Sequence, residues 1–294
     1  MIIDAHNHAD WHKHGFQAFV KNMDECHIDK TWLLTWETPD TERNLSDLSV
    51  LGNPALHGST GGVPASLAQG VYYRDRLPGR FILGYAPDPR RGGALLNLKA
   101  AMDLYGIQVC GEVKFRMMYD NYDAIEMFHF CADAGLPVTL HFDYPAANPS
   151  NMQYPFRNWW YGGSVDTLER VLQACPDTVF LGHAPGFWAH ISGDDCGLTK
   201  AYPRGPVLPG GRIEYLLEHY PNLYCDMSAG SARIALSRDP EYSEKLINRF
   251  PERFVYARDN FDNELQGFIA QLNLSEDVEE LLYHKNAERI VREL

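Results

Sequence analysis

Short apolar runs alternate with amphipathic segments along most of this chain. From Phe16 to Cys26 the apolar residues recur with the i, i+3, i+4, i+7 spacing of a helix that has one buried face. Other windows with helix-forming patterns and end signals are 65–75, 94–104, 122–134, 165–174, 213–219, 241–250, 263–273 and 278–293. Between them lie short runs typical of buried strands, which start at residue 1 and recur at 31–36, 81–86, 111–115, 138–142, 178–183, 223–227 and 254–257.

This alternation predicts an α/β fold, because parallel strands need a helical crossover between them. Eight such units close naturally into a (β/α)₈ TIM barrel, and we expect one domain over residues 1–294. A doubly wound open sheet is the alternative, although no G-x-G-x-x-G follows the first strand. Long βα loops are expected at 38–63 and 184–209, and an aromatic loop follows residue 142.

The composition narrows the classes of partner. The chain has 26 basic and 39 acidic residues and a net charge of −13, which argues against nucleic acid. It has no apolar window long enough for a membrane span and no leader-like start, so we expect a cytoplasmic protein that does not bind membranes. Its scattered cysteines indicate buried reduced thiols. A small-molecule substrate is the expected partner, and homo-oligomer formation is left open.

Ionisable residues recur at the ends of the predicted strands. His6 and His8 end the first strand, and the later strands supply Glu112, Lys114, His141, His183 and Asp259. Strands of a (β/α)₈ barrel end at one face, so these side chains should meet there. Nitrogen and oxygen ligands without thiolate suit Zn²⁺, Mn²⁺ or Fe²⁺. The second His-x-His pair, His12 and His14, has no apolar strand before it and is expected in a solvated or lid segment.

The ordered motifs resemble the amidohydrolase superfamily, and most closely its amidohydrolase-related branch (amidohydrolase 2). They are Asp4-Ala5-His6-Asn7-His8, Leu-Pro-Val-Thr-Leu-His141, Leu-Gly-His183-Ala-Pro-Gly, Arg-Asp259-Asn and Asn286-Ala287-Glu288-Arg289-Ile290. The resemblance implies a metal-dependent (β/α)₈ hydrolase, in a branch that also contains decarboxylases, lactonases and hydratases. It makes His6, His8 and His141 metal ligands, His183 a ligand or catalytic histidine, and Asp259 a ligand and proton acceptor. The family motif usually reads Gly-Ser-Asp where this chain has Ala257-Arg258-Asp259.

The expected function is therefore metal-dependent hydrolysis of an ester, lactone or amide bond in a small polar substrate, either sugar-derived or an aromatic acid. A metal dication bound to the protein lowers the pKa of its coordinated water to about 7, and Asp259 can take the proton of that water. Non-oxidative decarboxylation, with His183 or Asp259 as proton donor, is the alternative. Asp4 could orient an imidazole or be a structural carboxylate. The candidate substrate-binding residues are Lys114, Arg116, Trp36, Tyr144, Trp188 and His190.

The number of metal ions depends on Glu112 and Lys114, two residues apart on one strand. Either could bridge two cations, Lys114 only after carbamylation, whereas a simple ion pair between them is the alternative. We expect zinc as the metal, with manganese or iron as alternatives. We also expect Glu112 to be a ligand, His183 to complete a second site, and Lys114 to remain a cation facing substrate.

Overall fold

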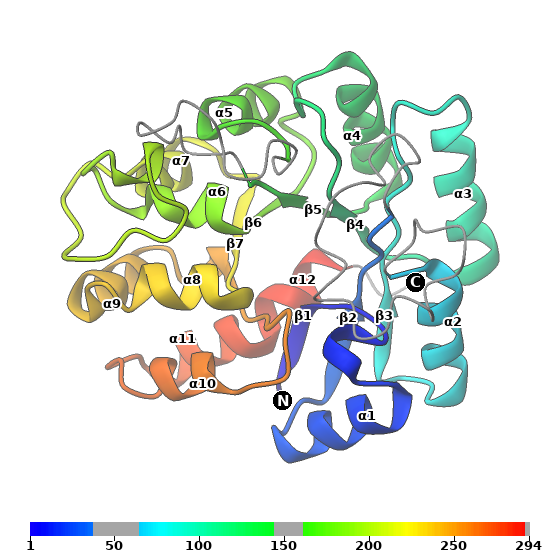
Figure 1. Cartoon of the computed structure of the whole chain (residues 1–294), viewed down its shortest axis with the longest axis horizontal. Coiled ribbons are helices and arrows are strands. Elements are labelled where there is room, and N and C mark those ends of the chain that lie inside the picture. Colours follow the sequence, from blue (N-terminus) through cyan, green and yellow to red (C-terminus); the bar gives the residue numbers. More distant parts are fainter. Residues whose placement is uncertain (38–64, 144–160, 292–294) are drawn as a thin grey trace.

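The computed structural model describes residues 1–37, 65–143 and 161–291, and within them eight parallel strands form the centre of the molecule (Figure 1). The strands are β1 (Ile3–Asn7), β2 (Lys30–Leu33), β3 (Phe81–Leu83), β4 (Cys110–Val113), β5 (Val138–His141), β6 (Phe180–His183), β7 (Leu223–Asp226) and β8 (Phe254–Val255). They pair in chain order, as β1-β2-β3 and as β4 through β8. The observed strands are shorter than the predicted apolar runs.

Backbone hydrogen bonds join the two groups of strands into a closed barrel. On one side the Ala5 amide donates to the Tyr256 carbonyl at 3.0 Å, which links β1 to β8. On the other side the Tyr85 amide donates to the Val109 carbonyl at 3.0 Å, next to a parallel bridge between Gly84 and Val109. The predicted (β/α)₈ barrel is confirmed.

Helices surround the strands (Figure 1). They are α1 (Phe16–Glu25), α2 (Leu67–Arg76), α3 (Ala94–Tyr105), α4 (Tyr122–Ala134), α5 (Val165–Ala174), α6 (Pro185–Trp188), α7 (Arg212–His219), α8 (Ala229–Leu236), α9 (Pro240–Arg249), α10 (Glu264–Ile269), α11 (Glu276–Glu280) and α12 (Asn286–Ile290). A π-helical turn, Leu281–Lys285, separates the last two. The sequence pattern did not predict α6 and α8. No helix in these described segments is long and apolar enough to cross a membrane.

Two apolar layers hold the barrel together. The inner layer takes side chains from strands around the barrel, including Ile3, Trp32, Leu181 and Val255. Ala287 and its neighbours in α12 belong to the same cluster, so this last helix packs against the barrel interior. The larger outer cluster lies between strands and helices. Burying these side chains is the main stabilising contribution to the fold.

A buried ion pair lies behind the seam between β1 and β8. The Asp4 carboxylate accepts from Arg258 Nε at 2.9 Å and from the Arg258 backbone amide at 2.8 Å. The guanidinium also donates to Asn22 of α1, so both charged groups face the outer layer. The pairing register of β1 shifts between Asp4 and Asn7, and Asp4 therefore does not share the face of the histidines that follow it. Of the two roles considered for Asp4, the structural one is observed.

The Asp4–Arg258 pair provides a test of stability. We expect Arg258→Met to lower the free energy of unfolding by about 3–5 kcal/mol, because it leaves a buried carboxylate without its cation. Urea unfolding followed by circular dichroism measures the change. Adding Asp4→Asn should recover part of the loss. Lys21→Met, which breaks an exposed pair with Glu25, should cost no more than about 1 kcal/mol. Equal losses for the two single variants would contradict a special role of the buried pair.

Candidate active site

Four histidines, from β1 and the residue directly after it and from β5 and β6, converge at the carboxyl-terminal rim of the barrel. The rings of His6 and His183 lie 4.4 Å apart, and those of His6 and His8 lie 5.2 Å apart. The ring of His141 lies 5.1 Å from that of His183. All are buried, so the structure brings together the four histidines expected from the strand ends.

Glu112 lies at the centre of this group and is 2% exposed. Its Oε1 is 2.5 Å from His141 Nδ1 and 3.5 Å from His183 Nε2. Its Oε2 is 3.5 Å from His8 Nε2 and 4.0 Å from His6 Nε2. One carboxylate therefore faces all four imidazoles.

The charges around Glu112 decide which groups are ionised. Burial would raise the pKa of Glu112, but the Lys114 ammonium and the contacts with His141 and His8 together hold the pKa well below its usual value. Burial would likewise lower the pKa of Lys114, but Glu112, with smaller contributions from Tyr161, Asp259 and Asp143, reverses that effect and raises the pKa. Burial and Lys114 together lower the pKa of His141 to about 4. The protein thus holds an anionic carboxylate, a cationic amine and a neutral imidazole side by side at neutral pH.

Each remaining imidazole is oriented through its Nδ1 atom. His6 Nδ1 is 2.6 Å from Asp226 Oδ2, and His8 Nδ1 is 2.9 Å from the Leu34 carbonyl. His183 Nδ1 is 2.8 Å from Ser228 Oγ. These contacts direct the Nε2 atoms towards the centre, as in metal-binding histidines held by outer partners.

Sequence reasoning did not identify Asp226 or Ser228. Asp226 is the last residue of β7, so the strand-end rule that selected the other residues would also have found it. Its carboxylate has a marked effect on the cluster. Burial alone would lower the pKa of His6, but the charge and hydrogen bond of Asp226, with smaller contributions from Glu112 and Asp259, raise it to about 9. The imidazole-orienting role considered for Asp4 belongs to Asp226.

Asp259 approaches the cluster from the segment after β8. Its Oδ1 is 3.5 Å from His8 Nε2, and its backbone amide donates to the His6 carbonyl at 2.8 Å. Burial raises the pKa of this carboxyl. Its φ of 51° lies in the left-handed region, which Asp tolerates better than most residues. The carboxylate expected at the end of the eighth strand is therefore beside the histidines.

The donor atoms fit a divalent metal ion. His6 Nε2, Glu112 Oε2 and Asp259 Oδ1 are buried and have no hydrogen-bond partner within the part of the chain that the structure describes. Ligand atoms of His6, Glu112 and His183 lie within 4.8 Å of one another, as do those of His6, His8 and Asp259. Buried polar atoms without partners are costly, and a cation would satisfy them.

A cationic and aromatic wall borders the cluster. Lys114 Nζ lies 3.9 Å from the centroid of the Trp36 ring and 5.6 Å from that of Tyr161. The Arg116 guanidinium lies 5.4 Å from the Tyr161 centroid. Ammonium and guanidinium groups over ring faces are cation–π arrangements. The predicted substrate-binding residues Lys114, Arg116 and Trp36 thus share one wall.

The other predicted substrate-binding residues are placed differently. Trp188 is fully buried, and its indole donates to the Asp226 carbonyl at 2.9 Å, so it supports β7 rather than presenting a surface. His190 lies in the short helix Ala189–Ile191, where burial and the Arg212 charge lower its pKa. Tyr144 lies outside the described residues.

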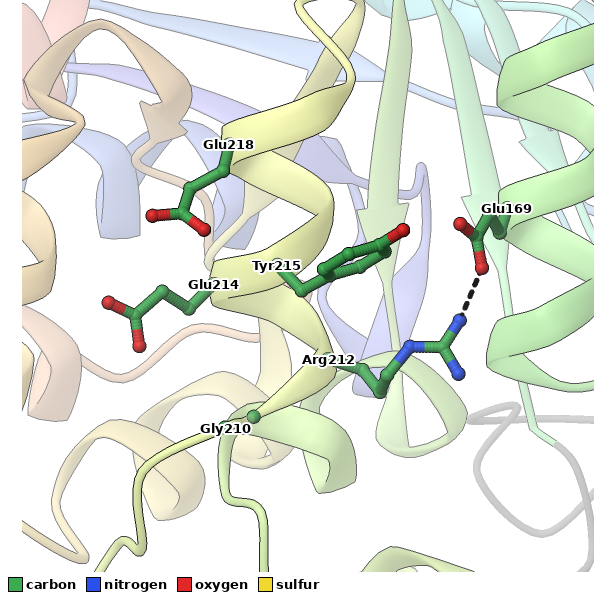
Figure 2. A pocket seen from close by; sticks show the side chains of 7 residues that line it. Glu169, Gly210, Arg212, Glu214, Tyr215 and Glu218 are labelled. Atoms are coloured by element: carbon green, nitrogen blue, oxygen red, sulfur yellow. Dashed lines mark hydrogen bonds and ion pairs between the residues drawn. The ribbon is translucent and has the colours of Figure 1, made fainter.

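Arg212 belongs to a separate hollow on the outer helices (Figure 2). This hollow of about 540 Å³ is lined by residues of α5 and α7 and the segment before α7, and none of the clustered histidines lines it. Its cation is already paired, since Arg212 donates to Asp166 and Glu169 at 2.6 Å each. The side chains in Figure 2 therefore form a charged surface hollow that the histidine cluster does not line.

Fold and cluster together define a (β/α)₈ barrel with histidines and carboxylates at its carboxyl-terminal rim. Among solved structures it is similar to a putative amidohydrolase from Staphylococcus aureus (12% identity, 99% of each chain, TM-score 0.59). It is also similar to a probable 2-pyrone-4,6-dicarboxylic acid hydrolase from Acinetobacter baumannii with citric acid bound (11% identity, 98% of each chain, TM-score 0.57). A third is a dihydroxybenzoic acid decarboxylase from Polaromonas with bound manganese and the inhibitor 2-nitroresorcinol (14% identity, 92% of this chain and 84% of that one, TM-score 0.55).

No protein-family model and no curated protein matches the chain. The expected resemblance to amidohydrolase-related barrels is confirmed at the level of the fold.

The contact between His6 and Asp226 can be tested directly. We expect Asp226→Asn to weaken metal affinity by about 10–100-fold, because the amide loses the charge that makes the imidazole a good ligand. Competition with a chromogenic chelator measures the affinity. Asp133→Asn, an exposed position of α4, is the matched control and should leave it unchanged. Equal affinities for the two variants would contradict the role given to Asp226.

Proposed function

We propose that this protein is a metal-dependent hydrolase that cleaves an ester, lactone or amide bond in a small polar substrate. The observation that carries the proposal is the set of buried ligand atoms on His6, Glu112 and Asp259 that have no hydrogen-bond partner among the described residues. Enzymes of both the hydrolase and the decarboxylase type occur among the structural relatives. A metal-dependent enzyme is the function that this combination supports best.

His6, His8 and Asp259 are spaced to hold one ion, and Glu112 and His183, which also lie beside His6, would contribute to a second. The one free ring nitrogen of His6 can bind only one of the two, because its Nδ1 contacts Asp226. His141 belongs to neither group. Its Nδ1 contacts Glu112, so it would support the site by holding that carboxylate in position. Zinc is the proposed metal, and the manganese of the Polaromonas enzyme supports manganese as the alternative. When bound, the metal would polarise the substrate carbonyl and acidify a water molecule.

The protein side chains would provide the proton transfer. Asp259 would accept the proton of the attacking water and return it to the leaving group. Its carboxylate is well placed for this, because Oδ1 is buried beside His8 and has no hydrogen-bond partner among the described residues. Neutral His183, whose pKa is lowered by burial, is the second candidate for moving a proton.

Lys114 would bind the substrate as an uncarbamylated cation. Its ammonium lies over the Trp36 ring at the edge of the cluster, where a substrate carboxylate could meet it while a planar group contacts the aromatic rings. The 2-pyrone-4,6-dicarboxylic acid named for the Acinetobacter protein is a molecule of this kind. A carboxylate-bearing sugar derivative or aromatic acid is the proposed substrate class.

Non-oxidative decarboxylation is the second candidate. It is favoured by the same wall, since an aromatic acid seated on Trp36 with its carboxylate near Lys114 presents the group that such an enzyme removes. His183 or Asp259 would then supply the proton that replaces carbon dioxide. The two reactions use nearly the same residues and differ in their products.

Metal analysis and a substrate panel test the proposal. We expect purified protein grown with zinc and manganese to contain at least one equivalent of metal per chain, and chelation should abolish activity. A panel of lactones, esters, amides and aromatic acids, followed by a pH indicator and by carbon dioxide release, distinguishes hydrolysis from decarboxylation. Less than about a tenth of an equivalent of metal would overturn the proposal. Two equivalents would support the binuclear arrangement.

Asp259→Asn tests the proton acceptor. We expect kcat to fall by about 10²–10⁴-fold while metal content stays near that of the wild type, because the amide oxygen can still coordinate but cannot accept a proton. Steady-state kinetics and metal analysis of the same preparation check both parts. Asp262→Asn, an exposed position nearby, is the control. Activity of Asp259→Asn within a few-fold of wild type would move the role to another base.

A further inference from the structure

We propose that Trp11 is a positioning residue for Asp259 and His8, and this inference rests on the proposed function. Trp11 belongs to the second His-x-His stretch, whose expected character was that of a solvated or lid segment. The structure divides that stretch, because His12 and Lys13 are exposed whereas Trp11 is 6% exposed. Its indole therefore points inward from an otherwise exposed turn.

The first step concerns the backbone of Asp259. The Trp11 Nε1–H group donates to the Asp259 carbonyl at 2.9 Å. The backbone amide of Asp259 donates to the His6 carbonyl at 2.8 Å. Asp259 is thus held on both sides in its left-handed conformation, which a non-glycine residue keeps only when its surroundings enforce it. Loss of the indole donor would free the carbonyl side.

The second step concerns His8. The Trp11 ring meets the His8 imidazole at 4.9 Å between centroids and at an interplanar angle of 64°. Because His8 Nδ1 is fixed on the Leu34 carbonyl, the indole edge restricts the remaining tilt of the ring. The same indole lies 5.9 Å from Trp36, the residue beneath the Lys114 ammonium. One side chain therefore touches the proposed base, a proposed ligand and the substrate wall.

The third step is that the turn is anchored from outside the cluster. Asp10 accepts from Tyr73 Oη at 2.7 Å and from Gln69 Nε2 at 2.9 Å, both on α2. Asp10, His12 and Lys13 all have positive φ, so this backbone adopts its shape only with such support. The contacts with α2 consequently fix the position of Trp11, and Trp11 in turn fixes the position of Asp259.

A purely structural role for Trp11 makes different predictions. Trp32 is the matched control, because it is also a buried tryptophan but its Nε1 has no hydrogen-bond partner among the described residues. Trp32→Phe and Trp11→Phe remove the same atoms, and only the second removes a hydrogen bond to Asp259. Tyr73→Phe loosens the anchor of the turn without changing Trp11.

The experiment titrates Co²⁺ alone into metal-free wild type, Trp11→Phe, Tyr73→Phe and Trp32→Phe, and then measures kcat and KM. We expect Trp11→Phe to weaken Co²⁺ binding about tenfold, to shift the visible Co²⁺ absorption bands, and to lower kcat at least tenfold with little change in KM. Tyr73→Phe should change these quantities in the same direction and by less. Trp32→Phe should lower only thermal stability.

If Trp11→Phe keeps the Co²⁺ affinity, the Co²⁺ spectrum and the kcat of the wild type, the positioning role is overturned, while the proposed function stays intact. Equal changes in Trp11→Phe and Trp32→Phe would also overturn it, in favour of general packing. If Trp11→Phe does not fold, Tyr73→Phe decides by the same measurements. Absence of Co²⁺ binding by the wild type would instead reject the proposed function, and the inference with it.

Discussion

A buried carboxylate among imidazoles is the constraint on which the carboxyl-terminal rim depends. Removing a charge from water is costly unless partners surround it, and Glu112 is almost completely buried. Its oxygens meet histidines from three other strands, and the Lys114 ammonium together with these contacts favours its ionised form. Displacing any of these strands would leave part of this charge unpaired. The electrostatics of one side chain therefore fix the relative positions of β1, β4, β5 and β6.

A second set of contacts holds the cluster from behind, and each contact belongs to a different part of the barrel. Asp226 of β7 orients His6, the backbone after β2 orients His8, and Ser228 orients His183. The Asp4–Arg258 pair joins β1 to the residue next to Asp259. Because these histidines are oriented by residues from other parts of the barrel, the geometry of the site depends on the closed barrel. The imidazoles are thus held close together by residues that lie outside the cluster.

Much of this organisation was predictable because helices and strand ends leave local signals. The limits of α4 and α5 agree with the predicted segments to the residue, since Asn121 and Gly135 cap the first and Ser164 begins the second. The orientation of Asp4 was not predictable, because strict alternation assumes an unbroken register and β1 shifts within three residues. The eight-residue α8 was also missed, although Ala229, Ala232, Ala235 and Leu236 recur with helical spacing. Asp226 was visible in the sequence and was overlooked.

The stretch that includes His12 and His14 shows the deeper limit of reading chemistry from residue type. A repeated His-x-His pair draws attention to its imidazoles, yet His12 is exposed and His14 stacks on Phe261 at 3.7 Å between ring centroids. The tryptophan between the two pairs is the residue that reaches Asp259. Its direction depends on backbone angles that Asp10, His12 and Lys13 adopt only because α2 holds the turn. Such long-range support leaves no periodic pattern, and only the folded structure reveals it.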